Sequence, residues 1–532
     1  MELTGWDLRV DAMGSALCGI LSAALLFPLA RRTWPERPGL AWFFALMGSA
    51  LALSPQHWIN WIWGVQTCYT MVVVTTMAAV VTLHSGLPAW QRIAIAGGLA
   101  FAGTLSFVAG LLAWFAGLAV LLMAPRKSGT GLWQEMAGWL ALSALGFFLF
   151  FHDYQPAHVP GRPSIMAAVL ARPWSYAEYF LTVLGAPLSE PWPEWEKDLR
   201  GQVQAVSSMV VAVVCLGLLS ILGVRIWRSR HAGSLHKAAP WLVLCGWSMA
   251  TAVLIALGRT GQRWSGPLEG RYQVFLIWFH IGLTALLFLQ AGRFWKPVKI
   301  AWLVLLLGAW TMGAWRGWID VRQDRLRTSL TGAVVSMRAV GPEPELNGFL
   351  TALGDSYETL IDRLDAEGLI AVKMVPGPFV RDATMADPAR HVGKLTRGGV
   401  DQSGSGLEIR GWAMRKDTRG AADAMAVSVQ REGGEERWLG LAQRRIREPK
   451  ATARWNAREV EDRIGWSFQR SLAPPDPAPG AARPPYQPLP QGTVTFRAYA
   501  LDARSGAFTR LEGEVILDLA PPPSTPDVGS RK

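Results

Sequence analysis

The segment "SPQHWINWIWGVQ", residues 54–66, joins two long apolar runs at 39–54 and 66–83. Three of its residues are tryptophan, which is enriched where membrane helices meet water. The run on each side is close to the length that an α-helix needs to cross a hydrocarbon core of about 30 Å. The segment therefore predicts a membrane protein whose chain turns at the membrane surface at this point.

The composition of the whole chain agrees with this prediction. The chain has 532 residues, 51% of them hydrophobic, and 27 tryptophans, yet its last third is polar and rich in Arg, Pro and Gly. This division predicts a polytopic membrane domain followed by a water-soluble domain. The net charge is +12. Much of the basic excess lies in short loops beside apolar runs, so it indicates membrane orientation rather than nucleic-acid binding.

Further apolar runs define the membrane domain, which we place at 1–316. Runs of spanning length occur at 12–30, 39–54, 66–83, 132–151, 204–224, 239–258, 273–291 and 299–316. The stretch 93–124 is too long for one ordinary helix and has a weak break, "GTLSFVAG", at 103–110. We expect two short helices there that meet on the far side of the membrane. The predicted fold class is an all-α polytopic domain of about ten transmembrane helices.

Arginine and lysine are concentrated in alternate loops, which the positive-inside rule places in the cytoplasm. The loops 55–65, 152–203 and 259–272 then lie outside. Arg92 and Arg126 share a side only if 93–124 is a hairpin. Arginines also follow the last span on its predicted outer side, partly offset by two aspartates, and we place the C-terminal domain on that side.

The same orientation places the N-terminus outside. The start, "MELTGWDLRVD", has neither a basic n-region nor a cleavage site, so it is not a signal peptide. An outward N-terminus usually follows an earlier span, and this favours an upstream helix and outer loop that the chain lacks. The alternative is a short N-terminal tail that crosses the membrane unaided.

Beyond the spans, the pattern predicts short helices and then strands. The loop segment 164–188 is apolar and split by Pro173, which indicates one or two short helices in the membrane interface. We expect a helical connector at 317–400. Alternating strand-like segments follow at 407–414, 425–431, 464–470, 492–501 and 512–519. These predict a small β-sandwich at 401–520, with a Pro-rich loop at 472–491 and a disordered tail at 521–532.

The tryptophan segment also carries polar side chains that could form a site. If 54–67 is one helix, a single stripe contains Gln56, Asn60, Trp63, Gly64 and Thr67. In that arrangement Trp58 and Trp61 are interface anchors. Trp63 shares a face with two amides, and a planar ring beside amide donors suits a sugar. Packing of the stripe against a neighbouring helix is the alternative.

A second group lies in the loop "LGRTGQRWSGPLEGRY", residues 257–272. Arg259 ends an apolar run, where a guanidinium is costly unless an anion or the interface receives it. Arg263 and Arg271 add positive charge, and Glu269 could hold an arginine in place. The arginine fork matches phosphate geometry, so a lipid phosphate or diphosphate is the functional interpretation. The alternative is that the arginines extend to lipid headgroups.

Other candidate groups are isolated. Asp153, at a span end beside His152, is the carboxylate best placed to act as a base. His280 lies inside a span and is either functional or a hydrogen-bonded packing histidine. The four cysteines lie inside apolar runs without metal-site spacing. No Walker loop, dinucleotide motif, metal-ligand cluster or nucleophile elbow occurs, which argues against an ATP-driven pump and a soluble-type hydrolase.

Four stretches together resemble, in order and spacing, a family of mostly uncharacterised bacterial polytopic membrane proteins. They are "SPQHWINWIWGVQ" (54–66), "SFVAGLLAWFAGLAVLL" (106–122), "YFLTVLGAPL" (179–188) and "LGRTGQRWSGPLEGRY" (257–272). That family looks like the GT-C glycosyltransferases, which move sugars from polyprenyl-phosphate donors on the outer face of the membrane. The resemblance covers about 1–320, and the closing "GWAM", "GWSF" and "FRAYALD" motifs resemble a β-sandwich appended to such proteins.

The resemblance implies a bacterial inner-membrane glycosyltransferase, or a degenerate relative, that transfers a sugar to a cell-envelope glycan. The C-terminal domain would then be periplasmic. The expected partners are membrane lipid, the polyprenyl-phosphate sugar and the glycan, with no nucleic acid, and a divalent metal requirement is left open. The implied residues are Arg259, Arg263 and Arg271 for the donor phosphate, Gln56, Asn60, Trp63 and Gln66 for the sugar, Asp153 as base, and Glu269, Tyr272 and His280 nearby.

Two departures from the family pattern bear on catalysis. Family members often carry an acidic residue before the Asn of the tryptophan motif, where this chain has Ile59. The family also takes its catalytic acid from the first outer loop, whereas Asp7 and Asp11 lie near that region without matching the motif. The competing class is therefore a non-enzymatic transporter or assembly partner for lipid-linked glycans. The chain shows no repeated halves, which are common in transporters.

Overall fold

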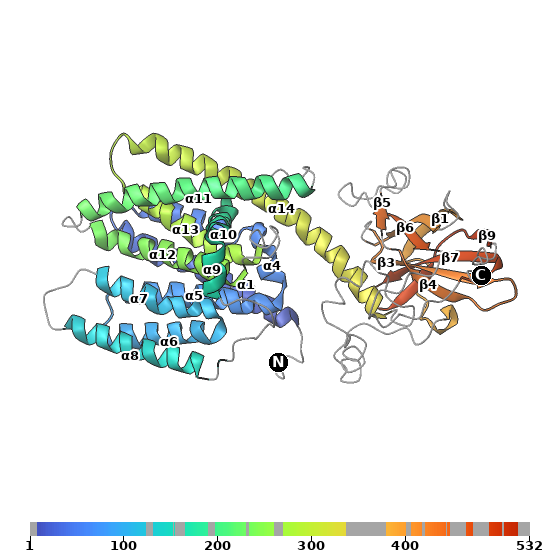
Figure 1. Cartoon of the computed structure of the whole chain (residues 1–532), viewed down its shortest axis with the longest axis horizontal. Helices are drawn as coiled ribbons and strands as arrows, with labels where there is room; N and C mark the ends of the chain where they lie inside the picture. The colour runs from blue at the N-terminus through green and yellow to red at the C-terminus, as the bar shows by residue number, and fades with distance from the viewer. Residues whose placement is uncertain are drawn as a thin grey trace, which may run out of the picture. The chain divides into compact units, whose positions relative to one another are not determined.

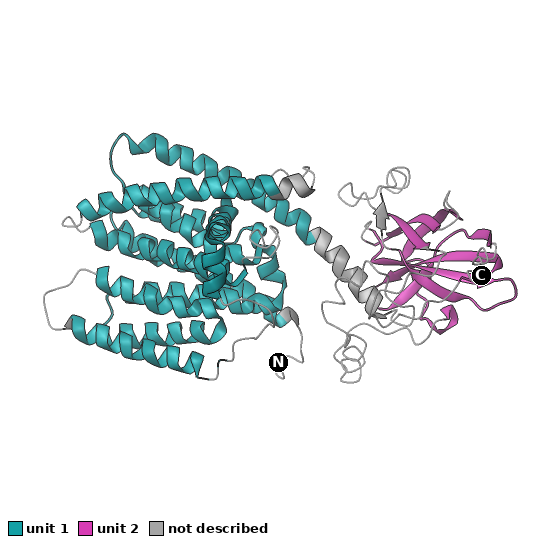
Figure 2. Cartoon of the chain, viewed as in Figure 1, with its two compact units in different colours: residues 1–321 teal, residues 322–532 magenta. Residues whose placement is uncertain are grey.

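The fold was analysed in a computed structural model of the chain. It describes residues 8–123, 131–152, 154, 165–189, 197–229, 234–259, 270–336, 379–400, 406–417, 421–442, 444–446, 464–471, 489–502 and 505–519. The chain forms two compact units, residues 1–321 and 322–532 (Figure 2). The predicted division into a helical and a β-rich part is confirmed.

The first unit is a bundle of long helices that run alongside one another (Figure 1). Its helices are α1 (Leu8–Ala24), α2 (Leu26–Thr33), α3 (Pro38–Ala52), α4 (Trp58–Ile62), α5 (Thr67–Leu83), α6 (Ala89–Ser106), α7 (Leu112–Met123), α8 (Gly131–Phe151), α9 (Ile165–Ala171), α10 (Pro173–Gly185), α11 (Lys197–Arg228), α12 (Ser234–Arg259), α13 (Gly270–Leu289) and α14 (Trp295–Ser336).

Within the described residues, eight segments are long and apolar enough to cross a membrane, which indicates a multi-pass membrane protein. They are Val10–Thr33, Pro38–Ile62, Gly64–Leu83, Leu132–Phe151, Gln202–Arg228, Ser234–Arg259, Gly270–Leu289 and Trp295–Val321. The segment Val108–Met123 is apolar but shorter. The predicted total of about ten crossings would also require α6 and α7 to cross.

Helices α6 and α7 meet at the predicted break. Helix α6 ends at Ser106, and a 3-10 turn, η4 (Val108–Leu111), leads into α7. The indole nitrogen of Trp114 donates to the hydroxyl of Thr104 at 2.9 Å, although ten residues separate them. A continuous helix would hold these residues about 15 Å apart along its axis. The chain therefore reverses here, as the hairpin prediction requires.

Helix α13 forms the centre of the bundle, because 89% of its spanning window is buried. It packs along α12, where Gly282 fits against the main chain of Trp241. Two buried polar groups in this region have partners: Ser248 donates to the carbonyl of Phe275 at 2.8 Å, and the Trp241 indole donates to Thr33 at 2.9 Å. Such bonds offset the cost of polar groups away from water.

Helices α9 and α10 run across the direction of the long helices (Figure 1). Pro173 begins α10, so the predicted split is confirmed. Helix α9 exposes apolar side chains such as Leu170, which is 74% exposed, and this suits a membrane interface. The second half of α10 is different, because Thr182 and Val183 are fully buried against the bundle. It is part of the core as well as of the interface.

The second unit contains two antiparallel sheets. Its strands are β1 (His391–Val400), β2 (Gly406–Arg415), β3 (Ala424–Arg431), β4 (Arg437–Leu441), β5 (Arg444–Ile446), β6 (Gly465–Ser471), β7 (Gly492–Asp502), β8 (Ala507–Arg510) and β9 (Val515–Leu519). One sheet has the order β1-β2-β6-β5, and the other has β4-β3-β7-β8 with β9 also paired to β7. Ile409 and Phe468 of the first sheet share one core cluster with Val427 and Phe496 of the second.

The predicted domain boundaries need correction at two places. Residues 391–400 were expected in a helical connector, but they form strand β1 and pair with β2 from His391↔Arg415 to Val400↔Leu407. Three glycines in this strand weaken its sequence pattern, and Gly393 lies against the main chain of Trp412 and Ala413. Helix α14 also continues to Ser336, past the predicted boundary at 316. Most of the Pro-rich loop and the whole predicted tail, 521–532, lie outside the described residues.

Candidate functional site

The tryptophan segment is not a single helix. A 3-10 turn, η2 (Pro55–His57), precedes α4, and a second turn, η3 (Gly64–Gln66), follows it. Between them Trp63 is extended, with φ −91° and ψ 106°. The one-stripe prediction is therefore wrong, because this break rotates the side chains that follow it away from the face of Asn60.

The tryptophans consequently exchange their predicted roles. Trp63 is 42% exposed, whereas Asn60 is fully buried. The ring of Trp61 packs so closely on Gly19 of α1 that a side-chain carbon at Gly19 would clash with it. Trp61 is a packing residue rather than a simple interface anchor, and Trp63 lies where an interface anchor or the rim of a site would be.

Asn60 connects α1, α4 and α13. Its side-chain nitrogen donates to the carbonyl of Gly270 at 3.1 Å, and its main-chain carbonyl accepts from the hydroxyl of Ser15. Ser15 is in turn 3.1 Å from the hydroxyl of Thr70. The side-chain oxygen of Asn60 is buried and has no hydrogen-bond partner among the described residues. It is an acceptor held in a fixed position.

Two of the predicted phosphate-binding arginines come together at this end of the bundle. Arg259 is the last residue of α12, and Arg271 is the second residue of α13. The ring of Tyr69 on α5 lies 5.4 Å from that of Phe275, so the first turn of α5 packs beside the first turns of α13. The guanidinium of Arg271 lies 5.2 Å from the centre of the Tyr272 ring. The other predicted members of this loop, Arg263 and Glu269, lie outside the residues that the structure describes.

The remaining amides and Tyr272 divide into packing and unpaired groups. Gln56 packs on Gly313 of α14, where a side-chain carbon would lie 2.6 Å from the Gln56 oxygen. Gln66 is 3% exposed and Tyr272 is 4% exposed. The side-chain oxygen of each lacks a hydrogen-bond partner in the described part of the chain. The side-chain oxygens of Gln66 and Tyr272 could therefore bind hydroxyl groups.

His280 is not part of this arrangement. It lies about 15 Å along α13 from Gly270 at 1.5 Å per residue. Its Nε2 is 3.0 Å from the carbonyl of Leu184, and its Nδ1 is 3.9 Å from the sulfur of Cys215. Both ring nitrogens therefore have neighbours in the core, which favours the packing interpretation. Asp153, the predicted base, lies outside the described residues.

Asp11 is a carboxylate whose place the sequence did not reveal. It lies on α1, and its main-chain carbonyl accepts from the hydroxyl of Thr67 at 2.7 Å, directly after Gln66. The carboxylate of Asp320 is different, because it is bound to Arg316 at 3.0 Å. No motif surrounds Asp11, so only its position at the start of a span could have pointed to it.

The second unit has its own pocket of about 400 Å³. Its lining includes Val380, Arg381, Met385, Glu435, Glu436, Tyr499 and Arg510. Glu436 accepts from the hydroxyl of Tyr499 at 2.6 Å and from Arg497 at 3.2 Å. Burial raises the pKa of Tyr499, and the neighbouring Glu436 raises it further, so the hydroxyl stays protonated and donates. Two arginines and two glutamates leave the lining close to neutral.

No group of three or more His, Cys, Asp or Glu within the described ranges could hold a metal ion. Comparisons of the chain with protein-family models, with curated proteins and with solved structures find no match. Its function must therefore be argued from its own residues.

Proposed function

We propose that the protein is a membrane glycosyltransferase of the GT-C type, or a degenerate relative. It would transfer a sugar from a polyprenyl-phosphate donor to a cell-envelope glycan on the outer face of the bacterial inner membrane. The observation that carries the proposal is the placement of Arg259 and Arg271 at the adjoining ends of α12 and α13. This cationic cluster adjoins the bond from Asn60 to Gly270.

The chemistry requires a cation for the leaving phosphate and a carboxylate for the acceptor. The acceptor hydroxyl attacks the anomeric carbon, its proton passes to the base, and the polyprenyl phosphate leaves with the bonding electrons. Arg259 and Arg271, with Arg263 as a further member, would stabilise that phosphate. The unpaired oxygens of Asn60, Gln66 and Tyr272 would bind sugar hydroxyls.

The base is assigned to one of two carboxylates. Asp153 follows from the sequence, and Asp11 follows from the contact of α1 with Thr67. Trp63 would cover the sugar from the rim of the site, because its ring is partly exposed. Gln56 would support the site by packing rather than by contact with the sugar.

The proposal extends to the second unit. The two sheets would form a β-sandwich on the outer side of the membrane, and its pocket would hold neutral sugar units of the acceptor glycan. The balanced charges of Arg381, Glu435, Glu436 and Arg510 suit hydroxyl groups better than a charged ligand. The helical unit would cross the membrane about ten times.

One observation favours the alternative, a non-enzymatic transporter or assembly partner for lipid-linked glycans. Ile59 lies near Gly270, where a side-chain carbon would be 3.6 Å from the Ile59 methyl group. The resembling family often has an acidic residue at the position of Ile59, and an isoleucine cannot accept a proton. The site would then bind the lipid-linked sugar without transferring it.

The test is sugar transfer in membranes that contain the full chain, with undecaprenyl-phosphate hexoses as labelled donors. Arg259→Ala should abolish transfer, and either Asp11→Asn or Asp153→Asn should do the same. Arg225→Ala is the matched control, because Arg225 packs on Trp295 in another part of the bundle. Unchanged transfer in Arg259→Ala would remove the site assignment. Movement of the lipid across the membrane without transfer would support the alternative.

A further inference from the structure

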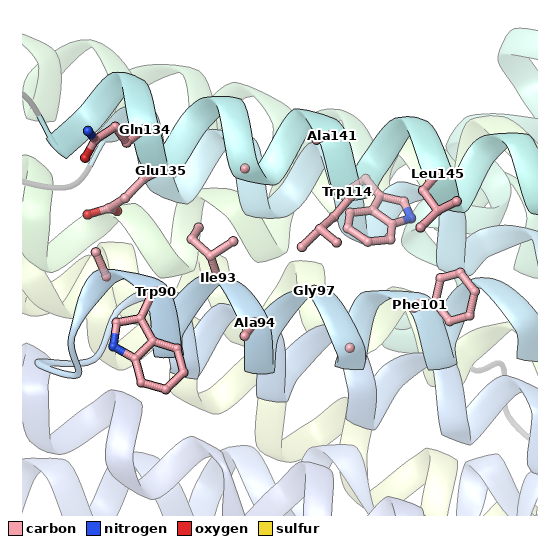
Figure 3. Close-up of a pocket in the computed structure, with 14 residues that line it drawn as sticks. Trp90, Ile93, Ala94, Gly97, Phe101, Trp114, Gln134, Glu135, Ala141 and Leu145 are labelled. Carbon is pink, nitrogen blue, oxygen red and sulfur yellow. The ribbon is translucent and has the colours of Figure 1, made fainter.

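A long apolar groove lies between α6 and α8 (Figure 3). Its volume is about 1030 Å³. Its lining repeats along both helices at one-turn spacing, from Ala89 to Phe101 on α6 and from Gln134 to Leu145 on α8. Only 11% of the spanning window of α8 is buried, so this helix is at the edge of the bundle. The groove therefore opens sideways, toward the surrounding membrane.

The length of the groove matches one leaflet of a bilayer. The first and last lining residues are twelve positions apart on α6 and eleven apart on α8. At 1.5 Å per residue this corresponds to about 16–18 Å. The hydrocarbon core is about 30 Å thick, so one leaflet contributes about 15 Å. A transmembrane helix of a partner would need a groove along the whole thickness. The tails of a single lipid need only this half.

The polar side chains of the groove gather at one end. Figure 3 shows Gln134, Glu135 and Trp90 at this end, and Phe101 and Leu145 at the other. Glu135 is bound to Arg92 at 2.8 Å, and both side chains are about one-fifth exposed, at 19% and 22%. Arg92 also donates to the carbonyl of Ser85 at 3.3 Å. Glu135 lines the groove and Arg92 is its fixed partner beside the lining, so this end carries a neutral ion pair.

The ion pair decides which headgroup fits. An ammonium group can approach Glu135, while the phosphate of the same headgroup approaches Arg92. A headgroup with a net negative charge would meet the carboxylate of Glu135 without a compensating ammonium. The pair is therefore complementary to a zwitterionic headgroup that carries both charges.

Small residues keep the groove open. A side-chain carbon at Gly98 would meet no atom within 4 Å, and Ala141 is exposed on the facing helix. Gly97 is different, because Leu142 packs directly on it at 2.6 Å from the position of a side-chain carbon. The helices touch at Gly97, and the space lies beside this contact along Gly98 and Ala141.

We propose that this groove is a binding site for one membrane phospholipid of a single leaflet. Its acyl chains lie along Gly98 and Ala141, and its zwitterionic headgroup, phosphatidylethanolamine, sits on the Arg92–Glu135 pair. The site does not depend on the proposed transferase function.

The test uses the full chain in nanodiscs with equal amounts of phosphatidylethanolamine and phosphatidylglycerol. Lipids retained after mild release are counted by native mass spectrometry. The wild type should retain one phosphatidylethanolamine in preference to phosphatidylglycerol. Gly98→Leu, which fills the groove, should lower this retention about tenfold. Gly217→Leu on α11 is the matched control, since its site is equally open, and it should retain the lipid.

Two further variants complete the test. Ala141→Leu fills the groove from the other helix and should act like Gly98→Leu, which protects the result if one variant fails to fold. Glu135→Gln should remove the preference for phosphatidylethanolamine while leaving total lipid retention unchanged. Equal retention of both lipids by the wild type would overturn the proposal. So would unchanged retention in both filled variants, or a lipid-free dimer that is lost when the groove is filled.

Discussion

Asn60 holds its part of the helical unit together through one hydrogen bond of its side chain and one of its main-chain carbonyl. It donates to Gly270 at the start of α13, and its carbonyl accepts from Ser15 of α1. A side-chain hydrogen bond within a membrane protein is worth about 1–2 kcal/mol at most in model systems. Because Gly270 adjoins Arg271, the same bond positions one of the two arginines of the candidate site.

We expect Asn60→Ala to lower the stability of the helical unit by about 1–2 kcal/mol, because the partly buried carbonyl of Gly270 loses its donor. The measurement is the apparent melting temperature of the purified full chain in detergent. Trp63→Ala is the control, and it should change the melting temperature less, because Trp63 is 42% exposed. A larger loss in Trp63→Ala would contradict the packing described for this segment.

Several residues of the candidate site could be selected from sequence, but their roles could not. Asn60, Arg259 and Arg271 were predicted from residue type and position, and the structure brings them to one end of the bundle. The exposure of Trp63 was not predicted, because the helical stripe was drawn through Gly64, which directly follows the extended residue and begins the next turn. The position of Asp11 depends on a contact between helices that are distant in sequence.

At the scale of elements, glycine decides how helices meet in this unit. The reversal between α6 and α7 was predictable because Gly103 and Gly110 frame it. Gly110 sits against the carbonyl of Gly103 so closely that any side chain would clash with it. Strand β1 was missed for the opposite reason, because its glycines weaken the alternating pattern that predicts a strand.

Gly110→Ala should therefore destabilise the α6–α7 hairpin strongly. The added methyl group meets main-chain atoms, which cannot move aside as a flexible side chain can, so a loss of several kcal/mol is expected, roughly 3 or more. Gly98→Ala on α6 is the matched control, since it has open space and should be neutral or stabilising by up to about 1 kcal/mol. Folded yield and melting temperature of the full chain measure both. Equal behaviour of the two variants would argue against the close approach at Gly110.

At the scale of the molecule, described basic residues are more numerous at one end of the helical unit than at the other. Arg259 and Arg271 mark one end, next to the first turn of α5. The opposite end of α5 carries His84, whose ring lies 4.3 Å from that of His236. Other basic residues near this end are Arg32, which donates to Val81 at 2.7 Å, and Arg92, which donates to Ser85. This distribution follows from the alternation of basic loops in the sequence, which also predicted the membrane class. The sequence could not predict how the ends of α12 and α13 meet, because that contact is tertiary.

The orientation of the unit decides between an outer and an inner site. The positive-inside rule predicts that the end with Arg32 and Arg92 faces the cytoplasm. In a variant without the four native cysteines, a cysteine at Val65, which is 72% exposed, should react with an impermeant maleimide in intact spheroplasts. A cysteine at Gly86, in the loop between α5 and α6, should react only after permeabilisation. The reverse pattern would place Arg259 and Arg271 on the cytoplasmic side and would rule out an outer-face donor. The lipid groove would remain, but in the outer leaflet, because its polar end adjoins the same loop as Gly86.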